Sequence, residues 1–309
     1  MPLVSVVIPA YNREKFIIPA IESVKAQGIH DIEIIVVDDC STDDTVEKVL
    51  SVNESRIRLI RHEVNKGEAG ARNTGVRESL GKYVAYLDSD DQWLPGKLEA
   101  QLAYMENASS DVGGVYTLHY RLYKNGKRSI AGYPPKSGGL TFENLLVKGA
   151  SISAGSTLMF KRELYSRVGP YDEKTPLYVD WEWLLRFVKI ASLDLIPKPY
   201  AVYEKNPNFR KGDIQKKAAD IFLDKFYVAI KALPEKRRRE CLSRINLDVA
   251  RCYVENEGLR YALPYYWDAL RLKPNLSPGS LLNVIDGIFG TNILPFVDSH
   301  IRKDIRREK

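Results

Sequence analysis

Three aspartates stand within four residues, at Asp88, Asp90 and Asp91, directly after the apolar run Tyr83–Leu87. Carboxylates this close repel one another, which is costly unless a cation shares the site. Their hard oxygen ligands, with no histidine or cysteine nearby, favour Mg²⁺ or Mn²⁺ over zinc. The segment therefore indicates a divalent metal site, although aspartates are also common as ordinary turn residues.

Polar residues follow two more apolar runs. Pro9-Ala-Tyr-Asn12 comes after Leu3–Ile8, and Asp38-Asp-Cys-Ser-Thr-Asp43 comes after Ile32–Val37. Each segment alone could be a turn or a helix cap, because Asp, Asn and Ser are favoured there. If the runs are parallel strands, their carboxyl ends meet at one edge of a sheet, where open α/β folds bind ligands. The convergence of three such segments favours a binding site.

The elements that must position these residues alternate along the first hundred residues. Apolar runs predict strands at 3–8, 32–37, 57–60 and 83–87, and the segments between them predict helices at 16–27, 43–50 and 68–80. A further helix is expected at 97–107. Strands joined by helices form a parallel sheet that is covered on both faces. The pattern predicts an α/β fold.

The composition is that of a folded enzyme, with 309 residues of which 44% are hydrophobic and 28% charged. The cysteines Cys40, Cys241 and Cys252 show no Cys-x-x-Cys spacing. A disulfide framework and a structural zinc site are therefore not indicated, and a reducing cytoplasm is favoured. No run approaches the roughly 18–20 apolar residues of a membrane-spanning helix, and no signal peptide is recognisable.

The histidines show no spacing suited to a metal site or a catalytic triad. We therefore expect them to be surface or loop residues. They are His30, His62, His119 and His300.

Several segments together resemble the family 2 glycosyltransferases, enzymes with the GT-A nucleotide-sugar fold. The matches to the first part of that pattern are 4–12, 35–45, 65–75 and 86–93. Gly169-Pro-Tyr-Asp-Glu173 then resembles the family's Gly-Gly-Phe-Asp-Glu stretch, and 179–186 resembles its Glu-Asp-x-x-x-x-x-Arg helix. The order of the matches makes the combination highly specific. It implies a Rossmann-like, mostly parallel GT-A sheet with flanking helices.

The resemblance assigns roles to individual residues. It implies that Asp180 is the catalytic base, which removes the proton of the acceptor hydroxyl, and that Asp90 coordinates Mn²⁺ or Mg²⁺. Asp39 is implied to accept a hydrogen bond from the base of the nucleotide, typically uracil. The full set implied to bind the nucleotide sugar is Pro9, Ala10, Tyr11, Asn12, Asp39, Gly67, Arg72, Asp88 and Ser89.

One departure from the family pattern bears on the base. Val179 stands where the family usually has Glu, which leaves Asp180 as the main base and Glu182 as a less favoured substitute. An acid at a helix start is also stabilised by the helix dipole alone. Trp181 and Trp183 could stack on a sugar, although aromatic residues of an amphipathic helix are more often core.

We expect two domains, a GT-A catalytic domain at 1–205 and a helical C-terminal region at 206–309 with a basic tail. The first contains 26 basic and 27 acidic side chains, a net charge of −1, and the second 20 and 13, a net charge of +7, so the positive excess of the chain lies in the C-terminal region. Its apolar and basic tail leaves two alternatives open, peripheral contact with the anionic inner face of the cell membrane and packing on the catalytic domain. No nucleic-acid motif accompanies the Arg-rich runs, and we expect no nucleic-acid partner.

The sequence predicts an inverting, metal-dependent, cytoplasmic glycosyltransferase. It would move one sugar from a nucleoside diphosphate sugar, with UDP favoured, to a hydroxyl of a glycan or lipid-linked acceptor in cell-surface polysaccharide or lipopolysaccharide biosynthesis. A nucleotidyltransferase is the enzymatic alternative, but it would need a Gly-rich phosphate loop where Pro9-Ala-Tyr-Asn12 stands. A non-catalytic scaffold with the same fold is the other alternative, because fold alone does not establish activity.

Overall fold

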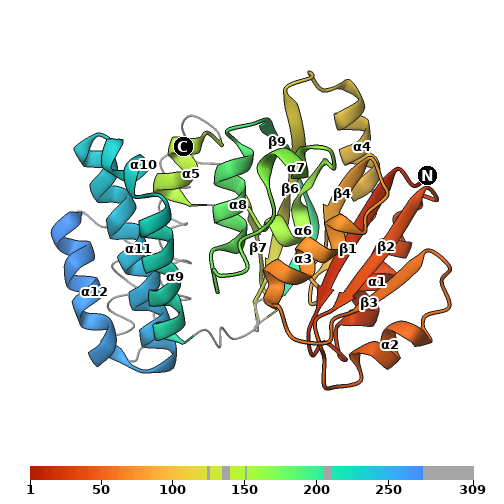
Figure 1. Cartoon of the computed structure of the whole chain (residues 1–309), viewed down its shortest axis with the longest axis horizontal. Helices are drawn as coiled ribbons and strands as arrows, with labels where there is room; N and C mark the ends of the chain where they lie inside the picture. Colours follow the sequence, from red (N-terminus) through yellow and green to blue (C-terminus); the bar gives the residue numbers. More distant parts are fainter. Residues whose placement is uncertain (124–125, 134–139, 150–151, 205–210, 274–309) are drawn as a thin grey trace. The chain divides into compact units, whose positions relative to one another are not determined.

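The structure of the chain is a computed structural model that describes residues 1–273 except 124–125, 134–139, 150–151 and 205–210. The chain divides into two compact units, residues 1–145 with 149–206 and residues 146–148 with 207–309 (Figure 1). The tail after residue 273 lies outside the described residues, and so do both alternatives for it, membrane contact and packing on the catalytic domain. Among the helices that are described, none has the length and apolar character needed to span a membrane.

Four parallel strands form the N-terminal part of the sheet in the first unit. They are β1 (Val4–Ala10), β2 (Ile32–Asp38), β3 (Ile57–Arg61) and β4 (Tyr83–Tyr86), in the order β3-β2-β1-β4. Every residue of β1 and β2 is buried, as expected for strands that are covered on both faces. The parallel pairing continues to Ala10 and Asp38. Pro9, Ala10 and Asp38 are therefore strand residues, not the loop residues that we expected.

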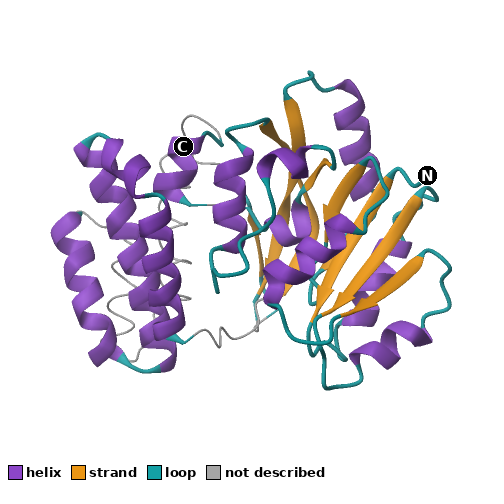
Figure 2. Cartoon of the chain, in the orientation of Figure 1, coloured by secondary structure: helices purple, strands orange, loops and turns teal. Residues whose placement is uncertain are grey.

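The remaining strands make the sheet mixed (Figure 2). They are β5 (Gln92–Trp93), β6 (Val112–Leu122), β7 (Arg128–Ala131), β8 (Met159–Lys161) and β9 (Ser192–Glu204). Strand β8 is antiparallel to β4 and β6, while the long strands β6 and β9 are parallel to each other. Short β5 and β7 pair antiparallel with β9 and β6. The predicted α/β fold is confirmed, with antiparallel strands added beyond β4.

Helices connect these strands. They are α1 (Ile17–Lys25), α2 (Thr45–Ser51), α3 (Gly67–Arg77), α4 (Lys97–Asn107), α5 (Phe142–Lys148), α6 (Ala154–Thr157), α7 (Leu164–Val168) and α8 (Val179–Phe187). Helix α3 packs on β1 and β2. Its residue Gly75 lies so close to Val7 that a Cβ atom would overlap the valine side chain. This close approach brings α3 down onto the strands that carry the predicted site.

The second unit is helical over its described residues, as predicted. It contains α9 (Gly212–Lys225), α10 (Tyr227–Ala232), α11 (Glu235–Asn256) and α12 (Leu259–Leu272). Helix α11 packs against both α9 and α12. At the start of α9, Gly212 lies against the ring of Tyr253, whose hydroxyl donates to Asp213 at 2.6 Å.

Candidate active site

Arg72 of α3 is the centre of charge in the predicted site. Its side chain is fully buried and forms ion pairs with Glu68 at 2.6 Å, with Asp88 at 2.9 Å and with Asp180. Burial alone would lower the pKa of Arg72, but these carboxylates more than offset it and hold the pKa well above its ordinary value. The guanidinium therefore stays charged and joins acids from three separate elements.

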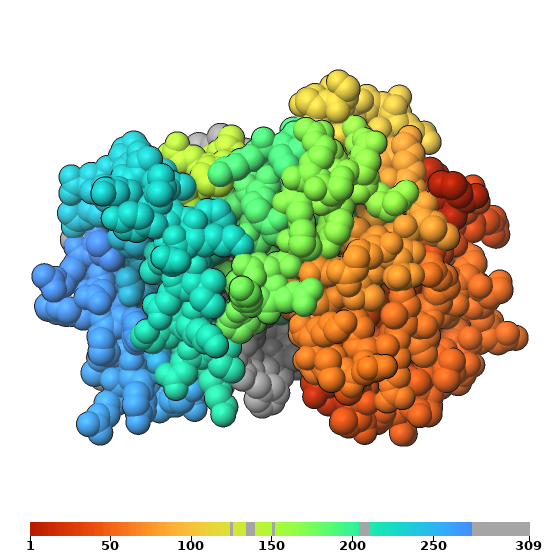
Figure 3. Space-filling view, viewed as in Figure 1, coloured from red at the N-terminus to blue at the C-terminus, as the bar shows by residue number. Residues whose placement is uncertain are grey.

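Aromatic rings enclose this guanidinium. Its central carbon lies 5.3 Å from the ring centroid of Tyr86 and 5.7 Å from that of Tyr171. Tyr171 in turn stacks on Trp183 with ring centroids 4.9 Å apart. Trp181 and Trp183 are both buried, so the core interpretation of these tryptophans is correct. Figure 3 shows the orange surface that includes α3 against the green surface of residues 160–187.

Asp180 is the second residue of α8, and the residue before the helix, Tyr178, has a positive φ of 62°. The Asp180 side chain is 29% exposed, so solvent can reach part of the side chain that Arg72 holds. Glu182, the alternative base, is buried, and its two oxygens accept from Arg186 at 2.7 and 2.8 Å. The geometry therefore favours Asp180 over Glu182 as a reactive carboxylate.

The acidic segment after β4 contains carboxylates in three different environments. Asp88 faces Arg72 and is 28% exposed. Burial raises the pKa of Asp88 to about 7, although the neighbouring Arg72 acts to lower it. Asp90 is 25% exposed and lies 3.7 Å from the Arg13 guanidinium. Asp91 is buried and accepts a short hydrogen bond from Ser156. Asp88 and Asp90 are thus the accessible acids, and Ser89 between them is buried.

The described residues contain no cluster of three or more His, Cys, Asp or Glu side chains that would enclose a metal by itself. Mg²⁺ and related ions are commonly held by one or two carboxylates together with water and substrate phosphates. The two partly exposed carboxylates of Asp88 and Asp90 fit such an incomplete donor set. A divalent ion is therefore compatible with this segment when a phosphate-bearing substrate completes its coordination.

Asp39, the predicted ligand of the nucleotide base, is buried and already bonded. Its oxygens accept from the backbone N–H groups of Lys66 at 2.8 Å and Gly67 at 2.7 Å, and one oxygen lies 2.7 Å from Nδ1 of His62. Nε2 of His62 lies 2.9 Å from the Thr74 hydroxyl. Asp39 therefore anchors the start of α3, and its contact with a base stays a prediction.

The histidine expectation is wrong for His119, whereas His62 lies in a loop as expected, although it is buried. His62 is 6% exposed and His119 2% exposed, because His62 bridges Asp39 and Thr74 and His119 lies in the interior strand β6. His30 is exposed as expected, and His300 lies outside the described residues.

The segment after β1 is fixed to the segment after β2. Asn12 has a positive φ of 53°, its backbone N–H donates to the Ser41 hydroxyl at 2.9 Å, and its side-chain oxygen accepts from Thr42 N–H at 2.9 Å. Tyr11 is 45% exposed, whereas Pro9 and Ala10 are buried in β1. The structure thus joins the predicted binding residues Arg72 and Asp88 directly, joins Arg72 to the predicted base Asp180, and leaves Tyr11 at the surface.

Several residues that hold the site were missed in the sequence. Glu68 is one helical turn before Arg72, a spacing that could have indicated the ion pair. Gly155 lies where a Cβ atom would overlap the Asp88 carboxylate and the Arg72 guanidinium. Ser156 bonds the acidic segment. No local pattern marks Gly155 or Ser156, because their partners are far away in the sequence.

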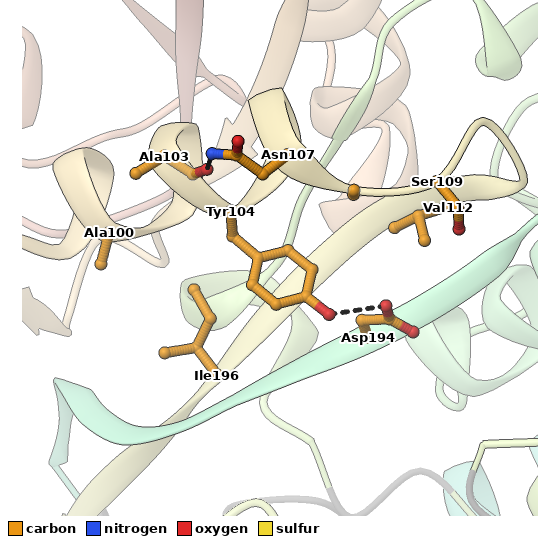
Figure 4. Close-up of a pocket in the computed structure, with 9 residues that line it drawn as sticks. Ala100, Ala103, Tyr104, Asn107, Ser109, Val112, Asp194 and Ile196 are labelled. Atoms are coloured by element: carbon orange, nitrogen blue, oxygen red, sulfur yellow. Dashed lines mark hydrogen bonds between the residues drawn. The ribbon is translucent and has the colours of Figure 1, made fainter.

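A pocket of about 580 Å³ lies away from these residues, between α4 and β9. Figure 4 shows Tyr104 across its centre, with the tyrosine hydroxyl donating to Asp194 at 2.7 Å. Small apolar residues such as Ala100 and Ala103 form much of the wall. None of the predicted site residues lines this pocket, so it does not locate the chemistry.

Solved structures share this fold. The Staphylococcus aureus protein TarS (residues 1–349), in complex with UDP-GlcNAc, superposes with a TM-score of 0.58 and 18% identity over 88% of this chain and 90% of that one. The mannosyltransferase PcManGT from Pyrobaculum calidifontis, in complex with GDP-Man and Mn²⁺, gives a TM-score of 0.55 and 21% identity over 93% of this chain and 79% of that one. The fold is therefore the GT-A fold of nucleotide-sugar-dependent glycosyltransferases.

Sequence comparison defines the family. Residues 5–169 match the family model described as glycosyl transferase family 2. The chain is also 34% identical over 192 residues to the UDP-Glc:alpha-D-GlcNAc-diphosphoundecaprenol beta-1,3-glucosyltransferase WfgD of Escherichia coli, a match that covers 62% of this chain and 73% of WfgD. The chain belongs to glycosyl transferase family 2, and it is a glycosyltransferase.

Proposed function

We propose that the protein transfers a single sugar, with inversion, from a nucleoside diphosphate sugar to a hydroxyl of a glycan or lipid-linked acceptor, and that it requires a divalent metal. UDP is the proposed nucleotide. The name of WfgD specifies UDP-Glc as donor and a diphosphoundecaprenol-linked acceptor, and TarS was solved with UDP-GlcNAc. Assembly of a cell-surface polysaccharide is the proposed setting.

The observation that carries this proposal is the bridge formed by Arg72 between Asp88 and Asp180. Through this bridge, the Arg72 side chain connects the segment after β4, which contains the proposed metal ligand Asp90, to the proposed base Asp180. Direct displacement at a sugar carbon needs both groups near the reacting atoms, one at the leaving diphosphate and one at the attacking hydroxyl. A scaffold protein would have no need for this arrangement.

In the proposed reaction, Asp180 accepts the proton of the acceptor hydroxyl as its oxygen attacks the anomeric carbon. Arg72 holds the Asp180 carboxylate in place through their ion pair. A bound divalent metal would neutralise charge on the departing nucleoside diphosphate. Asp90 would hold that metal, and Asp88 and Ser89 would face the donor beside it.

The negative charge of the donor phosphates would also act on the Arg72 guanidinium. Donor phosphates compete with Asp88 and Asp180 for the same guanidinium, because Arg forms strong bidentate pairs with phosphate as well as with carboxylate. Donor binding would then loosen Arg72 from Asp180 and leave that carboxylate better able to accept a proton.

A calorimetric screen of nucleoside diphosphates and nucleotide sugars with Mn²⁺ tests the proposal. We expect UDP and at least one UDP-sugar to bind, and transfer to follow when a hydroxyl acceptor is supplied. If no nucleoside diphosphate binds, the result contradicts the proposed function and supports the non-catalytic scaffold instead.

A further inference from the structure

Ser156 of α6 makes two hydrogen bonds to the acidic segment. Its hydroxyl oxygen accepts from the backbone N–H of Asp88 at 3.1 Å and donates to a carboxylate oxygen of Asp91. Ser156 is 1% exposed, so neither bond competes with solvent. One side chain therefore ties both ends of the segment from Asp88 to Asp91.

The segment that contains Ser156 is itself fixed from behind. Trp93 Nε1 donates to the Ser156 carbonyl at 2.8 Å, and the Gln101 amide donates to the Thr157 carbonyl at 2.9 Å. Lys97, which is fully buried, donates to the Gln101 side-chain oxygen at 2.7 Å and so fixes which end of that amide faces the carbonyl. The Ser156 hydroxyl is thus held by the interior of the fold, independently of any ligand.

The acidic segment is a closed turn, because the Asp91 N–H donates to the Asp88 carbonyl at 2.9 Å. Asp90 lies inside this turn and keeps a partly exposed carboxylate. The direction of that carboxylate therefore depends on the two ends that Ser156 holds. A loosened turn would let the Asp90 carboxylate rotate. This would weaken the binding of a metal that has few other protein ligands.

We propose that Ser156 is a positioning residue that orients the Asp88–Asp91 segment toward a divalent metal and the donor diphosphate. This inference rests on the proposed function and assigns part of it to a residue in α6. Groups that orient metal ligands commonly contribute about 10–100-fold to metal affinity.

Calorimetric titration of Mn²⁺ into the chain at a fixed UDP concentration tests this role. We expect Ser156→Ala to raise the Mn²⁺ concentration for half-maximal UDP binding by about 10–100-fold. The matched control is Ser153→Ala, on the same segment, where the hydroxyl makes no capping bond to α6. The control should titrate like the unmodified chain.

A double-mutant cycle makes the test specific. Asp91→Ala removes the acceptor of the Ser156 bond, so we expect the same shift from it, and little further shift when both substitutions are combined. Should Ser156→Ala fail to fold, Asp91→Ala alone carries the expected shift. Additive shifts, or variants that titrate like the unmodified chain, would overturn the role of Ser156. A failure of the unmodified chain to bind UDP with Mn²⁺ would instead overturn the proposed function, and this inference with it.

Discussion

Arg72 and Asp180 lie 108 residues apart in the chain and form an ion pair in the candidate active site. The pair joins α3, which packs on the parallel strands, to α8, which follows the antiparallel part of the sheet. Because Arg72 also contacts Asp88, the proposed base and the acidic segment share one buried cation.

Removal of the shared cation should destabilise the first unit. In Arg72→Met, the carboxylates that Arg72 joins lose their common counter-charge, and we expect the free energy of unfolding to fall by on the order of 3 kcal/mol. Denaturant unfolding measures the change. Lys25→Met is the control, because Lys25 pairs at 2.7 Å with Glu22, whose side chain is 51% exposed on the surface of α1; its effect should stay below about 1 kcal/mol. Equal effects of both variants would show that the Arg72 contacts add no special stability.

Substitution of the proposed base should affect the chemical step more than donor binding. For Asp180→Asn we expect kcat to fall by roughly 10²–10⁴-fold while the KM for the donor stays near that of the unmodified enzyme. Steady-state kinetics with a UDP-sugar and an acceptor separate the two constants. Asp194→Asn, at the remote pocket, should leave both unchanged. A loss of donor binding alone in Asp180→Asn would make Asp180 a pocket residue.

Gly155 should tolerate no side chain. In Gly155→Ala the added Cβ would overlap the Asp88 carboxylate and the Arg72 guanidinium, so we expect about 1–3 kcal/mol of destabilisation together with weaker donor binding. Gly258→Ala is the control, because no atom lies within 4 Å of a Cβ there. It should show only the cost of its positive φ and unchanged donor affinity. A Gly155→Ala chain with normal stability and UDP affinity contradicts the close packing.

His119 should make stability depend on pH. Burial, helped by Arg121, lowers the pKa of His119 from 6.5 to about 4 in the folded chain. Between pH 4 and 6.5 the unfolded chain binds more protons at this residue than the folded chain does. The free energy of unfolding is therefore undiminished by His119 above pH 6.5 and falls as the pH drops toward 4, by up to about 3 kcal/mol. Unfolding measured from pH 4 to 8 should therefore show a smaller pH slope in His119→Gln. In the control His30→Gln, where the residue is exposed, the slope should persist; a slope that also persists in His119→Gln rules out His119 as its source.

The fold was more predictable than the contacts of the site. Local signals place α4 at Lys97–Asn107 and start β2, β3 and β4 at the predicted residues, because apolar periodicity depends on neighbours in sequence. The apolar residues of α1 also recur with the helical period, and they are the residues that are buried, namely Ile17, Ala20, Ile21 and Val24. Contacts between segments that are distant in sequence produce no such local pattern.

Asp39 illustrates the limit for the site. Its position after β2 suggests an open ligand, yet the backbone N–H groups of Lys66 and Gly67 turn back onto its carboxylate. The burial of His62 follows from the same turn. Ser156 and Gly155 act on Asp88 from almost 70 residues away, and no property of either residue in the sequence indicates it.

The most direct test of the central claim is the release of UDP from a UDP-sugar that the chain binds, measured with Mn²⁺ and with EDTA in the unmodified chain and in Asp90→Asn. We expect release by the unmodified chain with Mn²⁺, little release with EDTA, and little release by Asp90→Asn even with added Mn²⁺. Equal release in EDTA, or undiminished release by Asp90→Asn with Mn²⁺, would contradict a metal-dependent transfer centred on the acidic segment.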